Sequence, residues 1–140
     1  MKTDNEIVQD FIQQQDLAVV STVTGDFLPS AAVVGIRSNE KMEIFFGTFL
    51  SSRKSQNLTK NPRVALVIGW DKGRTVQYEG EVHKLSGAAL KEFQDANLEH
   101  MPTAAKLVSK KEAVFYKVTP KWVRYMDLSK DPWEEIIIRF

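Results

Sequence analysis

The sequence predicts a mainly β protein, built as an antiparallel sheet with a few peripheral helices. Three observations lead to this fold class. Apolar runs rich in β-branched residues recur along the chain, turn-forming segments separate them, and the links between successive runs are short. Because consecutive strands with short links pair as hairpins, we expect about six or seven antiparallel strands in a sheet that can close to hide its edges.

The first predicted element is a helix, and a meander of three strands follows it. Apolar residues at helical spacing predict a helix over about residues 4–15, with Asp4 as its N-terminal cap. The turn signals Thr24-Gly25-Asp26 and Ser38-Asn39-Glu40-Lys41 then separate apolar runs. The strands of this meander are residues 17–23, 28–36 and 42–48.

A short helix and a long hairpin form the middle of the chain. The helix covers about residues 51–60 and stops before Asn61-Pro62, since a residue that precedes proline disfavours helical geometry. Strands at 63–70 and 75–85 flank a loop in which Gly73 supplies a positive φ. The second strand alternates, which predicts one face toward a core and one toward water or a polar interface. The core-facing residues are Val76, Tyr78, Gly80 and Val82.

The last third mixes two short helices with strands. Ser86 is a candidate cap for a helix at 87–97, with Leu90 and Phe93 facing inward, and a second short helix is predicted at 101–109. A strand at 113–126 should bend at Pro120, because proline cannot donate to the ladder. The segment 135–140 is either a strand or a docking tail.

Composition narrows the class of protein. The 140 residues fit one domain, with 43% hydrophobic and 26% charged residues. Nineteen basic residues against eighteen acidic ones argue against a dedicated nucleic-acid binder. There is no cysteine, which excludes disulfides, thiolate metal sites and a cysteine nucleophile. The sequence has neither a signal-peptide core nor an apolar run long enough to span a bilayer, so we expect a soluble, cytoplasmic protein.

The sequence contains no motif for several common kinds of active site. His83 and His100 have no partner at metal-ligand spacing, so we expect no metal site. Neither a G-x-S-x-G elbow nor a Rossmann or P-loop glycine pattern occurs. Glu79 and Glu81 share a strand face and could form an acid/base pair, but their period-2 spacing makes solvent exposure the default. We therefore predict no catalytic side chain.

Ser52-Arg53-Lys54 at the start of the second predicted helix is the most informative segment. A helix N-terminus carries about half a positive charge from its unpaired N–H groups, so two cations there oppose the dipole. A bound phosphate reverses that relation, because N–H groups, a hydroxyl and two cations would all converge on one anion. The alternative is a solvated basic turn.

The aromatic residues Trp70, Trp122, Tyr125 and Trp133 also need a role. Most buried aromatic side chains serve a core or a subunit interface. Trp122 and Tyr125 lie near the predicted bend and could instead edge a flat ligand, so both remain in the candidate site.

The order of motifs along the chain resembles a known family. The meander is followed by Phe46-Gly47-Thr48, Ser52-Arg53-Lys54 and Asn61-Pro62-Arg63, and the long strand carries Glu79-Gly80-Glu81. Over about residues 10–126 this set resembles the pyridoxamine 5′-phosphate oxidase-like FMN-binding split-barrel proteins, particularly the short bacterial general stress proteins. The resemblance implies one FMN-binding split-barrel domain over residues 1–140. It also implies a homodimer with two FMN sites at the subunit interface.

The resemblance assigns cofactor-binding positions as well. The isoalloxazine ring would lie along the second strand of the meander, and the phosphate would bind Arg53 and Lys54 with Ser52 beside them. A polar residue that opens the long strand would be Thr75 or Gln77. With the two aromatics above, the candidate cofactor-binding residues are Ala32, Val33, Val34, Arg37, Gly47, Thr48, Ser52, Arg53, Lys54, Thr75, Gln77, Trp122 and Tyr125.

Two departures from the family pattern bear on the activity. Pyridoxamine-phosphate oxidases proper have an arginine where this chain has Ala32, and an R-x-H segment that this sequence lacks. We therefore predict an FMN-dependent oxidoreductase that does not act on pyridoxamine phosphate, with Arg37 favouring the reduced flavin. The alternatives are a non-enzymatic flavin-binding or stress-related protein, a related barrel that uses deazaflavin or haem, and a cofactor-free structural dimer.

Overall fold

One antiparallel sheet organises the chain in a computed structural model, which describes residues 1–101 and 112–140. Its strand order is β2-β1-β5-β6-β7-β4-β3, and β8 also pairs with β7. The strands are β1 (Leu17–Val23), β2 (Pro29–Gly35), β3 (Arg37–Ser38), β4 (Ile44–Phe49), β5 (Arg63–Ile68), β6 (Arg74–Lys84), β7 (Ala113–Asp127) and β8 (Glu134–Arg139). Every pairing is antiparallel, which confirms the predicted fold class.

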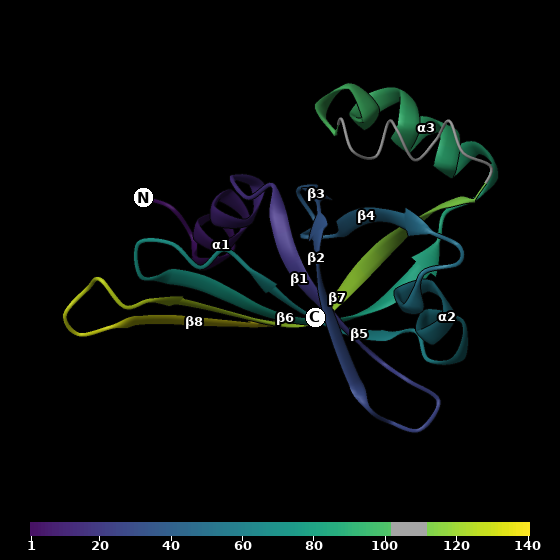
Figure 1. The fold of residues 1–140 in the computed structure, drawn as a ribbon. Coiled ribbons are helices and arrows are strands. Elements are labelled where there is room, and N and C mark those ends of the chain that lie inside the picture. The colour runs from purple at the N-terminus through teal and green to yellow at the C-terminus, as the bar shows by residue number, and fades with distance from the viewer. Residues whose placement is uncertain (102–111) are drawn as a thin grey trace.

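The sheet curls because the chain passes at Ile36 directly from β2, at one end of the strand order, to β3 at the other end. The predicted meander is therefore right for its first two strands and wrong for the third: β2 pairs with β1, but β4 pairs with β3 and β7 and not with β2. Ile36 itself donates its N–H to the carbonyl of Asp16 at 2.9 Å. The two ends of the strand order are thereby joined by the chain, and the sheet curves into a split barrel (Figure 1).

Three α-helices lie outside this sheet within the described residues, and Figure 1 shows α3 well away from α1. They are α1 (Asp4–Gln13), α2 (Arg53–Lys60) and α3 (Gly87–Asn97), with the short 3-10 helix η1 (Leu98–His100) after α3. Thr3, and not the predicted Asp4, caps α1, because Thr3 and Glu6 form a reciprocal capping box. Ser86 precedes α3 as expected, although its side chain makes no capping hydrogen bond.

The core follows the alternation predicted from the strands. Val76, Tyr78 and Val82 are buried on the inner face of β6, and α1 adds Val8, Phe11 and Ile12. A smaller cluster under α3 holds Leu85, Phe93, Met101 and Phe115. The helix predicted at 101–109 falls almost wholly outside the described residues.

The long strand β7 is bent where the sequence predicted. Its register with β6 shifts between Glu79 and Gly80, which pair with Trp122 and Pro120 and leave Lys121 unmatched. The part of β7 before the bend pairs with β4, and the part after it pairs with β8. The segment predicted as either a strand or a tail is thus a strand, Glu134–Arg139.

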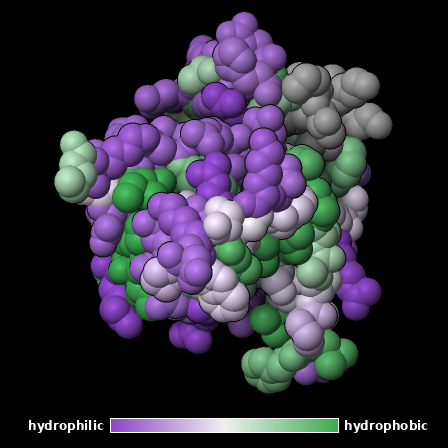
Figure 2. Space-filling view, turned by 90° about the vertical axis from the view of Figure 1, so that its left-hand side faces the viewer, coloured by the Kyte–Doolittle hydropathy of each residue, from purple (hydrophilic) through white to green (hydrophobic). Residues whose placement is uncertain are grey.

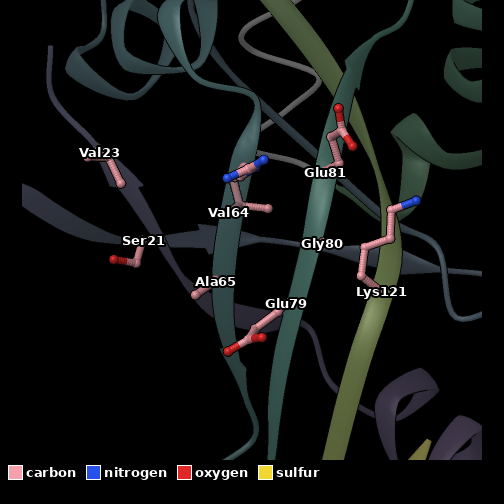
Figure 3. Close-up of a pocket in the computed structure, with 9 residues that line it drawn as sticks. Ser21, Val23, Val64, Ala65, Glu79, Gly80, Glu81 and Lys121 are labelled. Carbon is pink, nitrogen blue, oxygen red and sulfur yellow. The ribbon is translucent and has the colours of Figure 1, made fainter. Parts of the chain in front are cut away.

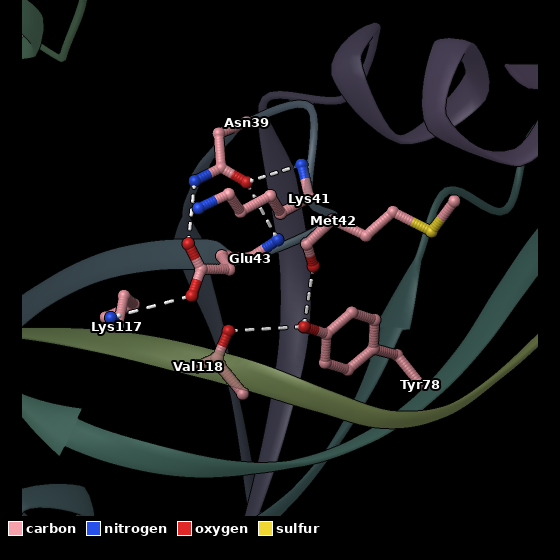
Figure 4. A network of polar contacts seen from close by, with 7 residues as sticks. All are labelled: Asn39, Lys41, Met42, Glu43, Tyr78, Lys117 and Val118. Atoms are coloured by element: carbon pink, nitrogen blue, oxygen red, sulfur yellow. Dashed lines mark hydrogen bonds and ion pairs between the residues drawn. The ribbon is translucent and has the colours of Figure 1, made fainter. Parts of the chain in front are cut away.

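A buried tyrosine on β6 links this strand to β7 and to the segment just before β4 (Figure 4). The Tyr78 hydroxyl donates to the carbonyl of Met42 at 2.7 Å and lies 3.3 Å from the carbonyl of Val118. Burial, with a smaller contribution from nearby Glu43, raises the pKa of Tyr78 far above its ordinary value. Asn39 accepts from the backbone N–H of Glu43 and so closes the turn that presents Met42.

No helix in the described part of the chain is both long and apolar enough to cross a membrane.

Candidate functional site

The start of α2 presents two cations and a hydroxyl that can donate. Ser52 caps the helix: its Oγ accepts from the N–H of Ser55 at 3.1 Å and from the hydroxyl of Thr48 at 3.1 Å. A hydroxyl has one donor and two acceptor positions, so the proton of Ser52 is left for another partner. Arg53 is exposed and Lys54 half-buried, and neither side chain has an ion pair or hydrogen bond with any described residue.

The charge pattern of this helix favours an anion at its N-terminus. The first turn of α2 contains no acidic residue, and Lys60 lies in the last turn. Arg53 and Lys54 therefore add to the positive end of the helix dipole, and no described carboxylate neutralises them. The Ser52 hydroxyl, the two side-chain cations and the free N–H groups of the first turn form a donor set suited to phosphate.

Two buried hydrogen bonds attach this helix to the barrel. Ser55 Oγ lies 2.9 Å from the Tyr116 hydroxyl on β7, and Asn57 Nδ2 donates to Thr22 Oγ1 on β1 at 3.0 Å. All four side chains are buried. None of these four residues was predicted for the site from the sequence; the available signal was an asparagine in a short helix whose single buried apolar side chain is Leu58.

Gly47 and Thr48 lie just before α2 and help to build it. Thr48 is buried, and its hydroxyl donates to Ser52, which makes it a support for the cap. A Cβ on Gly47 would lie 2.6 Å from Cε1 of Phe115, so the glycine makes room for that buried ring. Thr48 and Gly47 therefore each have a structural role, in the helix cap and in core packing, that does not depend on contact with a cofactor.

The predicted ring-binding residues of β2 face opposite sides of the sheet. Val33 points outward and is 59% exposed, whereas Val34 is buried and Ala32 is half-buried on the inner face. A ring against the outer face of β2 would meet the Val33 side chain and the backbone on either side of it.

Thr75, Gln77 and Trp122 share the outer face with Val33 but lie on distant strands. Strand registers place a row of outward-facing side chains across the sheet. In order from β2 to β8 this row is Val33, Val19, Val67, Gln77, Arg124 and Ile137. Three strand spacings separate β2 from β6, which is about 14 Å along the sheet. Within one chain, then, the candidates on β2 lie apart from those on β6 and β7, and α2 is attached to β1 and β7.

Tyr125 and Arg37 are placed apart from both groups. Tyr125 is 2% exposed and packs edge-on against Phe11 of α1, with ring centroids 5.5 Å apart, so it belongs to the core. Arg37 is half-buried and its Nε donates to Asn97 Oδ1 of α3 at 3.4 Å. It lines a cavity of about 350 Å³ between α3 and β4, where Lys117 and Glu43 form an ion pair at 3.5 Å.

The outer face of the sheet is also hollowed and carries mixed charge. A depression of about 520 Å³ lies over β1, β5, β6 and β7. Figure 3 shows Glu79 and Glu81 on β6 with Lys121 on β7 around it, and Arg63 also lines it. Glu79 is exposed, as the period-2 argument predicted, and Glu81 is half-buried. Two basic and two acidic side chains give this hollow no net charge.

Apolar side chains reach the exterior as well. On the side of the molecule drawn in Figure 2, green apolar areas interrupt the purple polar surface. On the outer face of the sheet Leu17, Val33 and Val67 are each more than 40% exposed. This apolar surface continues the charged hollow, since Val67 stands two residues from Ala65, which lines it.

Comparison with known proteins identifies the family whose model matches this chain. The family model described as pyridoxamine 5′-phosphate oxidase matches residues 5–127. Over 75 residues the chain is 37% identical to the pyridoxine/pyridoxamine 5′-phosphate oxidase of Wolbachia pipientis wMel, a match that covers 53% of this chain and 35% of that protein. The chain spans 35% to 47% of the length of the curated relatives it matches.

Solved structures share the fold. General Stress Protein 26 from Bacillus anthracis superposes with a TM-score of 0.73 at 21% identity, covering 97% of this chain and 98% of that one. A heme binding protein from Mycobacterium smegmatis superposes with a TM-score of 0.84 at 14% identity, and the match covers 99% of this chain and 59% of that one. A pyridoxamine 5′-phosphate oxidase-related, FMN binding protein from Nostoc punctiforme superposes with a TM-score of 0.72 at 13% identity, and the match covers 89% of this chain and 80% of that one. At these identities the likeness is one of fold.

Proposed function

Because the chain belongs to the pyridoxamine 5′-phosphate oxidase family, we propose that it binds FMN by its phosphate at the start of α2 and acts as an oxidoreductase. One observation carries the proposal. The side chains of Arg53 and Lys54 have no partner among the described residues, and they follow Ser52, whose hydroxyl already uses both of its acceptor positions. Such a donor set matches a dianionic phosphate.

The division of the candidate residues supports a site shared by two copies of the chain. A ring that lies along β2 does not reach Thr75 and Gln77, about 14 Å away across the sheet. If a second copy packs its outer face against the first, its β6 and β7 can cover the ring that α2 and β2 hold. The exposed Val33 and Val67 and the balanced charges of Arg63, Lys121, Glu79 and Glu81 suit a self-complementary, two-fold interface.

When bound, the flavin would supply the redox chemistry. The side chains then have three tasks. Ser52, Arg53 and Lys54 would bind the phosphate, Val33 would orient the ring, and apolar surface around it would exclude water.

The test compares FMN with riboflavin, which has the same ring but no phosphate. We expect Arg53→Ala/Lys54→Ala to weaken FMN binding about 100-fold, since hydrogen bonds to charged groups contribute about 1.5–3 kcal/mol each. Riboflavin affinity should stay unchanged. Lys41→Ala/Lys60→Ala removes the same charge from exposed positions and should leave both affinities intact. Equal FMN affinity in the Arg53→Ala/Lys54→Ala variant and the wild type would contradict the proposal.

Enzymatic activity and substrate need a separate experiment. Steady-state turnover with a reductant and an acceptor separates an oxidoreductase from a protein that only stores flavin. Ala32 faces the inner side of the sheet and offers no charge to a second phosphate. We therefore expect no conversion of pyridoxamine 5′-phosphate by the FMN-loaded protein, and detection of that conversion would overturn this part of the proposal.

Haem is the second candidate cofactor, since one structure with this fold is a heme binding protein. Haem iron takes its axial ligand most often from histidine. Both histidines are exposed, His83 on β6 and His100 in η1, and neither lies among the candidate residues near α2. Titration of the protein with each cofactor, followed by visible absorbance, distinguishes the two.

A further inference from the structure

The way α2 is attached to the barrel determines where its first turn points. The helix has eight residues, and its buried side chains are Ser55, Asn57 and Leu58. Hydrophobic burial acts through area and has no direction, and here one leucine supplies it. Hydrogen bonds depend on distance and angle, so the buried polar contacts fix the orientation of the helix.

The two polar contacts hold α2 from opposite sides. Ser55 and Asn57 are two residues apart, so their side chains leave the helix about 200° apart around its axis. Ser55 bonds to Tyr116 on β7, and Asn57 bonds to Thr22 on β1. Two other strands separate β1 from β7 in the sheet. The helix is thus held between two distant strands, which restricts both rotation and sliding.

Of the two contacts, the Asn57 contact is separate from the ligand-binding turn. Ser55 donates its N–H to the cap, so its replacement would disturb the first turn directly. Asn57 and Thr22 are 6% and 1% exposed, and their 3.0 Å hydrogen bond lies beyond the first turn. Neither side chain is placed to touch a ligand at Ser52.

We propose that Asn57 and Thr22 are a positioning pair, which orients α2 so that Ser52, Arg53 and Lys54 converge on one phosphate. The inference rests on the proposed function of that turn. It predicts that loss of the pair weakens recognition of the phosphate specifically, while the fold and the contacts of the flavin ring persist.

The test is the double variant Asn57→Leu/Thr22→Val, compared by FMN and riboflavin titration with the wild type. Both partners are replaced by apolar groups of similar size, so no buried polar group is left unpaired and the protein should fold. We expect FMN affinity to fall about tenfold, corresponding to a partial loss of the charge-assisted bonds. Riboflavin affinity should not change. Thr22→Ser keeps the hydroxyl and should retain the wild-type ratio of the two affinities.

The outcomes separate the inference from the proposed function. A wild-type affinity ratio in the double variant would overturn the positioning role, and so would an equal fall in both affinities. If the double variant does not fold, Thr22→Val alone is measured by the same ratio, with the same interpretation. A wild-type protein that binds FMN no better than riboflavin would refute the phosphate site itself, and the inference with it.

Discussion

The substitution of Gly47 tests whether this candidate-site residue is required for the packing of the neighbouring Phe115 ring. In the substitution Gly47→Ala, the new Cβ would lie 2.6 and 2.8 Å from two carbon atoms of the Phe115 ring. Phe115 is 2% exposed and packs against Phe93, with ring centroids 5.7 Å apart, so the ring has little room to move. Overpacking of this kind costs about 1–3 kcal/mol. The lower entropy of the unfolded chain returns about 0.4–1 kcal/mol, so we expect a net loss of about 1–2 kcal/mol.

The assay is urea unfolding in a double-mutant cycle with Phe115→Leu. The smaller side chain leaves room for the Cβ, so Gly47→Ala should cost little in that background, and the two changes should be coupled by about 1–3 kcal/mol. Gly35→Ala is the matched control, because its Cβ would meet only the carbonyl of Asp16, at 3.9 Å. Equal destabilisation by Gly47→Ala in both backgrounds would refute the packing argument.

Two further predictions concern Tyr78 and the outer face. Tyr78→Phe should lower the free energy of unfolding by about 1–2 kcal/mol at pH 7, because the carbonyls of Met42 and Val118 lose their buried donor. The raised pKa of Tyr78 means that the folded protein keeps the phenol proton, whereas the unfolded chain loses it above about pH 10. The free energy of unfolding of the wild type should therefore fall as the pH rises above that value. Urea unfolding of the variant should lack this part of the decline. Val67→Lys adds a charge to the exposed outer face and should yield a folded monomer by sedimentation that binds FMN weakly. A monomer with wild-type FMN affinity would argue against a site shared between two copies.

Local sequence pattern predicted most of the elements, and it failed where distant residues decide. Strand β1 spans the predicted residues 17–23, because an apolar β-branched run between turn signals specifies its own limits. Strand β5 was predicted to reach Trp70 but ends at Ile68. Gly69 adopts a φ of +77°, and any side chain there would collide with Phe11 of α1. That contact joins residues 58 positions apart, which no local pattern reveals.

The candidate site was predictable in its chemistry and less so in its geometry. Ser52, Arg53 and Lys54 stand at the start of a helix as predicted, because capping depends on adjacent residues. Period-2 alternation correctly gave β6 its inner and outer faces, but it could not say that two strands separate β6 from β2. Tyr125, a candidate for the edge of a flat ligand, is covered by Phe11, which lies 114 residues earlier in the chain.

The local energetics of α2 explain why its first turn needs support from elsewhere in the fold. Two cations beside the positive end of the dipole weaken the helix by about 0.3–1 kcal/mol each. Propensity adds little, because eight residues are too few for a stable isolated helix. The Ser52 cap and the buried hydrogen bonds of Ser55 and Asn57 offset this, each by about 1 kcal/mol. A fold that retains unfavourable charges and stabilises them with contacts from two distant strands follows the pattern of a functional site, where local preference yields to binding. A bound phosphate would convert the same two charges from a cost into an attraction.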